Sequence, residues 1–240
     1  MAVKDYDLDQ PMAQLIDLAV KKFGEVEFQT VAVGDVSIEV LQIKNMQQYI
    51  DKLMDKTRSG KKVGLPLWAK IWPSSVVLGF SLSRFPLPDG SRVLEIGGGS
   101  AVNGLVMASR GFDVTVVDND PDAVLFSRIN ALKNGLEEHV SCVRSDFKTV
   151  LDTSFDCIVA CEMLYEAPTF DVMADFINNS LTDAESAEVF LSLDLKRAAK
   201  GFFAQSNEYF NIMNSKAKYK DQDTGDEKDV NLFRFKRKSA

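Results

Sequence analysis

The spacing of hydrophobic side chains near the start of the chain predicts one helix and one β-hairpin. Apolar residues recur at helical spacing over 12–23, and Gly24 follows as a stop signal. Two β-rich runs at 28–33 and 36–43 flank the pair Gly34-Asp35, which is typical of a two-residue hairpin turn with glycine in first position. A second apolar helical face over 45–56 precedes a polar stretch. These patterns predict an N-terminal α+β appendage covering residues 1–62.

From residue 63 onward, short apolar runs of strand length alternate with segments of helical periodicity. The alternation predicts an α/β domain over residues 63–240, with buried parallel strands and helices packed beside them. The expected strands are 93–96, 114–118, 140–143, 155–161 and 189–195, with a final antiparallel pair at 212–219 and 230–236. The expected helices are 76–85, 103–110, 121–134, 170–181 and 196–210.

Composition agrees with one large domain and a small appendage. The chain has 240 residues, of which 45% are hydrophobic and 26% charged, so a sizeable core is possible. No run approaches the roughly 18 consecutive apolar residues needed to span a bilayer, and the N-terminus lacks a secretory apolar region. We therefore expect a soluble cytoplasmic protein without membrane attachment.

Charge and metal-binding residue types exclude several functions. The net charge of −7 argues against nucleic-acid binding, which needs clustered Lys and Arg. The basic run at 236–238 is expected to be a solvated tail. Three cysteines and one histidine, His139, do not form a zinc set, so we expect no metal site, free buried thiols and a loop position for His139.

A glycine triplet interrupts the boundary between a predicted strand and a predicted helix. Gly97, Gly98 and Gly99 follow the apolar run at 93–96, and a helical pattern follows them. Glycines allow a tight turn and close approach of a ligand, and a helix N-terminus offers free N–H groups. A dinucleotide fingerprint would need glycine where Val102 stands, so that reading fails.

The pattern of Glu95, Gly97 and Gly99 resembles motif I of the class I S-adenosylmethionine-dependent methyltransferases, although Ala101 stands where a third glycine often follows. Upstream, the segment Pro-x-Trp-Ala-x-x-Trp-Pro-Ser at 66–74 resembles the entry to the catalytic domain in the lysine methyltransferase-like group, methyltransferase family 16. The resemblance covers about 65–236. It implies a doubly wound, Rossmann-like sheet of seven strands, mostly parallel with the last strand antiparallel, and S-adenosylmethionine as cofactor across the carboxyl ends of the strands.

The cofactor residues follow from strand ends and from the resemblance. Asp118 ends a predicted strand about 20 residues after Glu95, where a carboxylate can accept both hydroxyls of a ribose. The resemblance implies that Trp72 lies near the cofactor, that Asp146 accepts from the adenine amino group and that Phe147 lines the ring. The expected cofactor-binding residues are Trp72, Glu95, Gly97, Gly98, Gly99, Asp118, Asn119, Asp146, Phe147 and Cys161.

Substrate chemistry is expected after the fourth strand of the domain. Family members commonly have Asp-x-x-Tyr here, whereas this chain has Glu162 and Tyr165, which places the carboxylate one methylene further out. We expect Glu162 to orient an ammonium group, with Tyr165 beside it, although a carboxylate also raises the pKa of an amine. A cap on the following helix is the alternative role for Glu162.

Three functions remain open from the sequence. The first is methyl transfer to a protein lysine, the second is methyl transfer to a small-molecule amine, and the third is a non-catalytic binding module that keeps the fold. The acceptor and the oligomeric state do not follow from the sequence.

Overall fold

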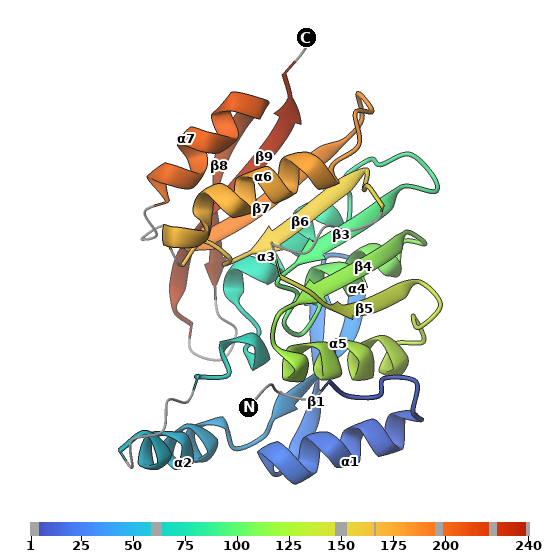
Figure 1. Cartoon of the computed structure of the whole chain (residues 1–240). Helices are drawn as coiled ribbons and strands as arrows, with labels where there is room; N and C mark the ends of the chain where they lie inside the picture. Colours follow the sequence, from blue (N-terminus) through green and yellow to red (C-terminus); the bar gives the residue numbers. More distant parts are fainter. Residues whose placement is uncertain are drawn as a thin grey trace.

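Seven strands form the central sheet in the order β5-β4-β3-β6-β7-β9-β8 (Figure 1). The computed structural model describes residues 5–58, 64–146, 153–165, 167–194, 199–220 and 225–238. The five neighbouring strands β5, β4, β3, β6 and β7 run parallel to one another. Strand β9 pairs antiparallel with both β7 and β8, which confirms the predicted fold class. The strands are β3 (Arg92–Ile96), β4 (Asp113–Asp118), β5 (Val140–Arg144), β6 (Cys157–Cys161), β7 (Glu188–Asp194), β8 (Phe210–Lys220) and β9 (Glu227–Arg237).

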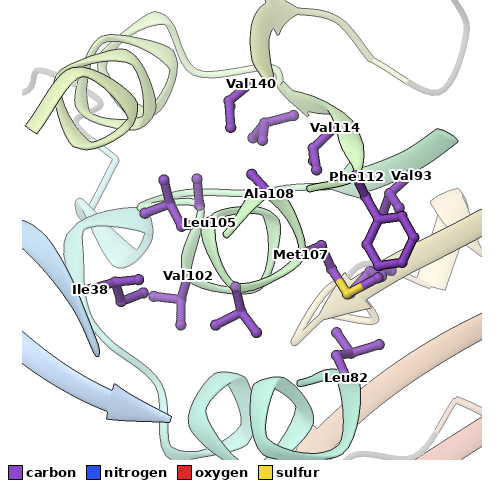
Figure 2. Close-up of a cluster of buried hydrophobic side chains, with 14 of the residues drawn as sticks. Ile38, Leu82, Val93, Val102, Leu105, Met107, Ala108, Phe112, Val114 and Val140 are labelled. Atoms are coloured by element: carbon purple, nitrogen blue, oxygen red, sulfur yellow. The ribbon is translucent and has the colours of Figure 1, made fainter. Parts of the chain in front are cut away.

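Helices cover both faces of this sheet. On one face, α4 (Val102–Ala108) and α3 (Pro73–Leu82) lie side by side, with α4 against β3 and β4 and α3 against β7 and β9. In α4, Leu105 and Ala108 are buried in the same cluster as the strand residue Val114 (Figure 2). The other face holds α6 (Phe170–Ser180) and α7 (Lys200–Tyr209), where Leu94 of β3 packs in a separate cluster. Helix α5 (Pro121–Lys133) follows β4. Because central strands are buried on both faces, their sequences are continuous apolar runs, which made them recognisable.

The N-terminal segment packs against the large domain. It contains α1 (Met12–Phe23), the hairpin strands β1 (Val26–Val33) and β2 (Val36–Ile43), and α2 (Met46–Arg58), as predicted, with Gly34 at a φ of 63° in the turn. Val33 and Ile38 belong to the same buried cluster as α4, and the Phe23 ring of α1 lies 5.4 Å from the Phe126 ring of α5. The hairpin therefore shares its core with the domain, and the division at residue 62 stays a prediction.

Two asparagines of α5 bond the hairpin backbone. The Oδ1 of Asn130 accepts from the N–H of Leu41 at 2.8 Å, and its Nδ2 donates to the carbonyl of Ser100 at 3.0 Å. Asn134 bonds both backbone groups of Glu39, each at 2.8 Å. The two side chains thus act as hydrogen-bonding partners for the free edge of β2.

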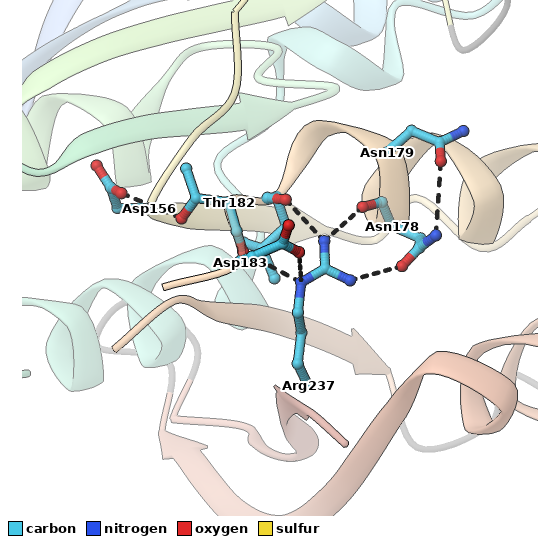
Figure 3. Close-up of polar contacts among 7 residues, drawn as sticks. Asp156, Asn178, Asn179, Thr182, Asp183 and Arg237 are labelled. Atoms are coloured by element: carbon cyan, nitrogen blue, oxygen red, sulfur yellow. Dashed lines mark hydrogen bonds and ion pairs between the residues drawn. The ribbon is translucent and has the colours of Figure 1, made fainter. Parts of the chain in front are cut away.

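The C-terminal basic run is not a solvated tail. Arg237 lies in β9 and its guanidinium donates to the carbonyls of Asn178, Leu181 and Thr182, with Asp183 at 3.4 Å (Figure 3). These carbonyls belong to the C-terminal end of α6 and the turn after it, where backbone acceptors have no partner within the helix. Arg237 therefore ties the last strand to α6, a contact that charge alone did not indicate.

Several helix boundaries differ from the sequence prediction: α3 ends at Leu82 rather than at residue 85, and α7 begins at Lys200 rather than at residue 196. Helix α3 begins at Pro73, three residues earlier than expected, because proline fits the first helical position. Helix α4 ends at Ala108 rather than at residue 110. Asp120 caps α5, since its carboxylate accepts from the N–H of Asp122 at 2.9 Å.

Asn130→Ala should lower the free energy of unfolding by about 2 to 4 kcal/mol, because the buried N–H of Leu41 and the carbonyl of Ser100 both lose their partner. Urea denaturation followed by circular dichroism measures this. Asn211→Ala is the control, since Asn211 is exposed on β8 and its removal should change stability by less than about 0.5 kcal/mol. Equal stability of both variants would contradict the role given to Asn130.

Candidate functional site

A cavity of about 800 Å³ opens at the carboxyl ends of β3, β4 and β6. Its wall also includes the 3₁₀ turn at Leu67–Ala69, the start of α3 and the segment leading into α6. Eleven of the residues expected at the site line it, whereas Phe147 lies outside the described residues. The eleven are Trp72, Glu95, Gly97, Gly98, Gly99, Asp118, Asn119, Asp146, Cys161, Glu162 and Tyr165.

The glycine turn leaves no space for side chains. Gly97 and Gly99 have φ angles of 62° and 56°. A Cβ at Gly97 would stand 1.9 Å from the sulfur of Met163, and one at Gly99 would stand 2.8 Å from the carbonyl oxygen of Trp68. Ala101, at a φ of 60°, takes the left-handed conformation that glycine adopts more readily, and α4 begins directly after it. The turn is thus fixed by backbone geometry and by close contacts.

Glu95 lies beneath this turn and is buried. Its Oε2 accepts from the N–H of Gly104 in α4 at 2.8 Å, and a Cβ at Gly104 would stand 2.6 Å from that oxygen. Burial raises the pKa of Glu95 to about 7, against the opposing effect of the hydrogen bonds from Gly104 and Asn103. The Glu95 carboxylate therefore joins β3 to α4 in addition to contributing to the cavity wall.

Asp118 connects two loops at the end of β4. Its Oδ2 accepts from the N–H of Gly99 at 3.0 Å, and its Oδ1 accepts from the N–H of Asp120 at 3.0 Å. Burial raises the pKa of this carboxyl group, and the two backbone hydrogen bonds oppose the rise. A carboxylate has about four acceptor positions, so roughly two remain for a ligand. Asn119 and Asp146 are exposed on the same side of the cavity.

The N-terminal segment supports this end of β4, a contact that no local sequence pattern predicts. Lys22 of α1 pairs with Asp122 at 2.5 Å, and the hydroxyl of Tyr6 donates to the same carboxylate at 2.7 Å. Asp122 in turn donates its N–H to the capping carboxylate of Asp120, which lines the cavity. Tyr6 and Asp122 are more than a hundred positions apart in the sequence, so no local sequence pattern predicts their contact.

Glu162 occupies an unusual backbone conformation at the end of β6. Its φ is 55°, and among the described residues only Ala101 shares a positive φ without being glycine. Its side chain is buried, and Oε1 accepts from the N–H of Asp194 at 2.7 Å, at the end of β7. Such conformations concentrate at functional sites because surrounding contacts must maintain them. Tyr165, three residues later, is exposed at the mouth of the cavity.

The tryptophans and Cys161 complete the wall. The Trp68 ring packs 4.8 Å from the Phe126 ring, whereas Trp72 is partly exposed and carries the ammonium of Lys70 4.7 Å from its ring centre. The thiol of Cys161 lies 3.4 Å from the hydroxyl of Ser74, and its burial raises its pKa. All three cysteines are free thiols, as expected.

The mouth of the cavity is apolar and its interior is acidic. Four large apolar or aromatic side chains that line it are 39% to 57% exposed: Leu65, Leu67, Tyr165 and Val172. Among the described lining residues, the acids are Glu95, Asp118, Asp120, Asp146 and Glu162, and Lys70 is the only Lys or Arg. This combination favours a cationic ligand group carried by an apolar body.

Within the described ranges, no three His, Cys, Asp or Glu side chains are grouped as metal ligands would be. The helices in these ranges also include none with the length and hydropathy needed to cross a membrane.

Sequence comparison gives one family and short curated matches. Residues 35–216 match the family model described as lysine methyltransferase. A ubiquinone biosynthesis O-methyltransferase of Idiomarina loihiensis is 33% identical over 82 residues, 33% of this chain and 33% of its own length. The same-named protein of Xanthomonas axonopodis pv. citri is 34% identical over 83 residues, 34% of each chain. The aligned region thus spans about a third of these curated relatives.

Solved structures share the fold at low sequence identity. A TehB-like SAM-dependent methyltransferase from Corynebacterium glutamicum has a TM-score of 0.51 at 14% identity, covering 81% of this chain and 98% of that one. A SAM-dependent methyltransferase from Agrobacterium tumefaciens has a TM-score of 0.57 at 14% identity, covering 88% of this chain and 71% of that one. The glycopeptide N-methyltransferase MtfA, complexed with sinefungin, has a TM-score of 0.55 at 13% identity, covering 69% of this chain and 87% of that one.

Glu95→Gln should remove a pH dependence of stability. The pKa of Glu95 is about 7 in the folded protein and 4.5 for an unperturbed group, so the native state holds this proton more tightly. Stability from this group is therefore greatest below pH 4.5 and falls as pH rises towards 7. The unfolding free energy of Glu95→Gln, relative to wild type, should rise by about 3 kcal/mol across that window.

Urea titrations at intervals from pH 4.5 to 8 measure this difference. Glu138→Gln, at an exposed position, should follow the wild-type profile throughout. A constant difference between Glu95→Gln and wild type at every pH would show that Glu95 does not retain its proton in the native state.

Proposed function

The chain belongs to the lysine methyltransferase family, and so to the S-adenosylmethionine-dependent methyltransferases, and we propose that it transfers a methyl group from this cofactor to a protein lysine side chain. The observation that carries the proposal is the cavity at the strand ends, with acids inside and exposed apolar side chains at its mouth.

The polar side chains of the cavity wall suit the polar groups of the cofactor. Asp118 retains acceptor positions for the ribose hydroxyls, because each carboxylate oxygen has one backbone donor. Asp146 stands beyond it as the proposed acceptor for the adenine amino group, and Trp72 and the glycine turn lie on the other side. We assign the remaining expected cofactor residues, including Asn119 and Cys161, to this binding surface.

Bound S-adenosylmethionine supplies an electrophilic methyl group, so the protein mainly has to align the acceptor amine and exclude water. Glu162 is the proposed orienting residue, because it is buried in the cavity wall and held by the N–H of Asp194. Its carboxylate attracts the charged amine, which favours binding but also favours the protonated form. Tyr165 is the proposed neighbour of the acceptor at the mouth.

The apolar mouth supports a protein acceptor over a small amine. Leu65, Leu67 and Val172 are substantially exposed to water. A small polar amine bound in the cavity would leave these apolar side chains uncovered. A lysine carries a long aliphatic stem, and neighbouring side chains of a protein substrate can cover this surface. Gly64 lines the cavity and follows the proposed appendage at 1–62 closely in the sequence, so we assign the appendage to shaping the acceptor surface.

S-adenosylhomocysteine should bind the wild type in the micromolar range by isothermal titration calorimetry, and Asp118→Ala should abolish the binding. The loss follows because the variant removes the ribose acceptor and frees the N–H of Gly99. Asp156→Ala is the control, since this aspartate also accepts a backbone N–H, from Arg92, but stands at the opposite end of the sheet. NAD should not bind. Absence of S-adenosylhomocysteine binding to the wild type would contradict the enzyme assignment.

Labelled methyl groups should appear in methyllysine when the enzyme is incubated with radiolabelled S-adenosylmethionine and a protein extract of its source organism, followed by acid hydrolysis and amino-acid analysis. Glu162→Gln should reduce the rate by about 100-fold, because the amine loses its orienting charge. Glu185→Gln, at an exposed position, should keep the wild-type rate. Label confined to small molecules would instead favour the small-amine function, and cofactor binding without any transfer would favour a binding module.

A further inference from the structure

One lysine of this chain lies in the cavity wall. Lys70 follows the 3₁₀ turn at Leu67–Ala69, is exposed, and is the only Lys or Arg among the described lining residues. The acids that line the same cavity attract positive charge. The cavity wall therefore already carries one amine of the kind that the proposed reaction methylates.

The backbone around Lys70 directs its side chain onto Trp72. Both residues are extended, with φ and ψ of −90° and 134° at Lys70 and of −84° and 138° at Trp72. Alternate side chains of an extended segment point to the same side, and Pro73 favours this conformation in the residue before it. The ammonium of Lys70 accordingly lies 4.7 Å from the centre of the Trp72 ring, while Ile71 between them packs against the core cluster that includes α4.

The ring is fixed, whereas the lysine side chain can move. The indole N–H of Trp72 donates to the carbonyl of Leu67 at 3.1 Å, which ties the ring to the preceding turn. Lys70 takes part in no ion pair within the described ranges. Attraction to an exposed aromatic face is weak, and the aliphatic stem of lysine is long and flexible. The amine can therefore leave the ring and enter the cavity without any change in the backbone.

The segment that carries this lysine is anchored at both halves of the site. Before it, the carbonyl of Trp68 accepts from the hydroxyl of Ser100, directly after the glycine turn, at 3.1 Å. After it, the hydroxyl of Ser74 lies 3.4 Å from the thiol of Cys161, the residue that precedes Glu162. The segment therefore runs between the turn where we propose the cofactor and the strand end where we propose the acceptor amine.

We propose that Lys70 is a methylation site of this enzyme, and that the chain methylates its Nζ within the same molecule. The inference rests on the proposed function, since it takes the cofactor and the reaction from it. The neutral amine of Lys70 attacks the methyl carbon of bound S-adenosylmethionine, so that a C–N bond forms as the C–S bond breaks. The electron pair of the C–S bond stays on the sulfur of S-adenosylhomocysteine, and one proton passes from the nitrogen to water. Because the amine is tethered beside the site, its effective concentration there is high without any protein substrate.

The chain alone, incubated with S-adenosylmethionine that carries a labelled methyl group, should become labelled, and peptide mass spectrometry should locate the methyl group on Lys70. Lys70→Arg should lose this label, because arginine keeps a cation over the Trp72 ring but removes the amine. Its melting temperature should equal that of the wild type, so that the loss reports the acceptor and not the fold.

Lys133→Arg is the matched control. Lys133 is also exposed, and its ammonium lies 4.9 Å from the centre of the Phe28 ring, but it does not line the cavity. We expect no label on Lys133 in the wild type and full labelling of Lys70 in Lys133→Arg. Label on both lysines to the same extent would show unselective modification and overturn the inference.

A second experiment separates transfer within one molecule from transfer between molecules. The fraction of chains labelled per unit time should stay constant over about a tenfold range of protein concentration, because acceptor and site belong to one chain. Asp118→Ala chains mixed with the wild type should remain unlabelled at Lys70, since they lack the proposed ribose acceptor. Label on Lys70 of those chains would overturn transfer within one molecule.

The failure of this inference is distinguishable from failure of the proposed function. A wild type that binds S-adenosylhomocysteine and labels lysine in the extract, but carries no label on Lys70, would refute this inference alone. A wild type that does not bind S-adenosylhomocysteine would refute the proposed function, and the inference with it.

Discussion

The hydrogen bond from the N–H of Gly104 to the buried carboxylate of Glu95 is the contact on which the site depends. It holds α4 against β3 across the glycine turn, so the turn cannot relax away from the strand ends. Because the carboxylate is buried, its charged form is poorly solvated and its pKa is raised. This loss of solvation accompanies the fixed geometry of the junction. The glycine turn, which forms part of the cavity wall, is held between the two elements joined at this junction.

The neighbouring strand end follows the same principle with a different carboxylate. Asp118 fixes the glycine turn and the start of the next loop through two backbone N–H groups, and Asp120 then caps α5. Lys22 and Tyr6 hold Asp122, two residues after Asp120, so the N-terminal segment also supports the site. Four of the acids that line the cavity thus also accept hydrogen bonds from backbone N–H groups: Glu95, Asp118, Asp120 and Glu162.

The sequence was sufficient for the sheet because its strands are buried on both faces and separated by clear turn residues. Local chemistry also sufficed for the hairpin turn at Gly34. It was insufficient where the partner is distant. Arg237 gave no sign that it binds the carbonyls of α6, and the position of Lys70 in the cavity wall appears only once the cavity and its neighbours are placed. The roles of the site residues themselves remain predictions.

The bonds of Asn130 and Asn134 to the hairpin have a consequence for biosynthesis. Their partners Leu41 and Glu39 precede them by 89 and 95 residues, so the hairpin leaves the ribosome well before the helix that completes its edge. A two-stranded hairpin alone is only marginally stable in water. During synthesis the hairpin therefore lacks the partners for its edge until α5 has emerged, so this edge is completed late in folding.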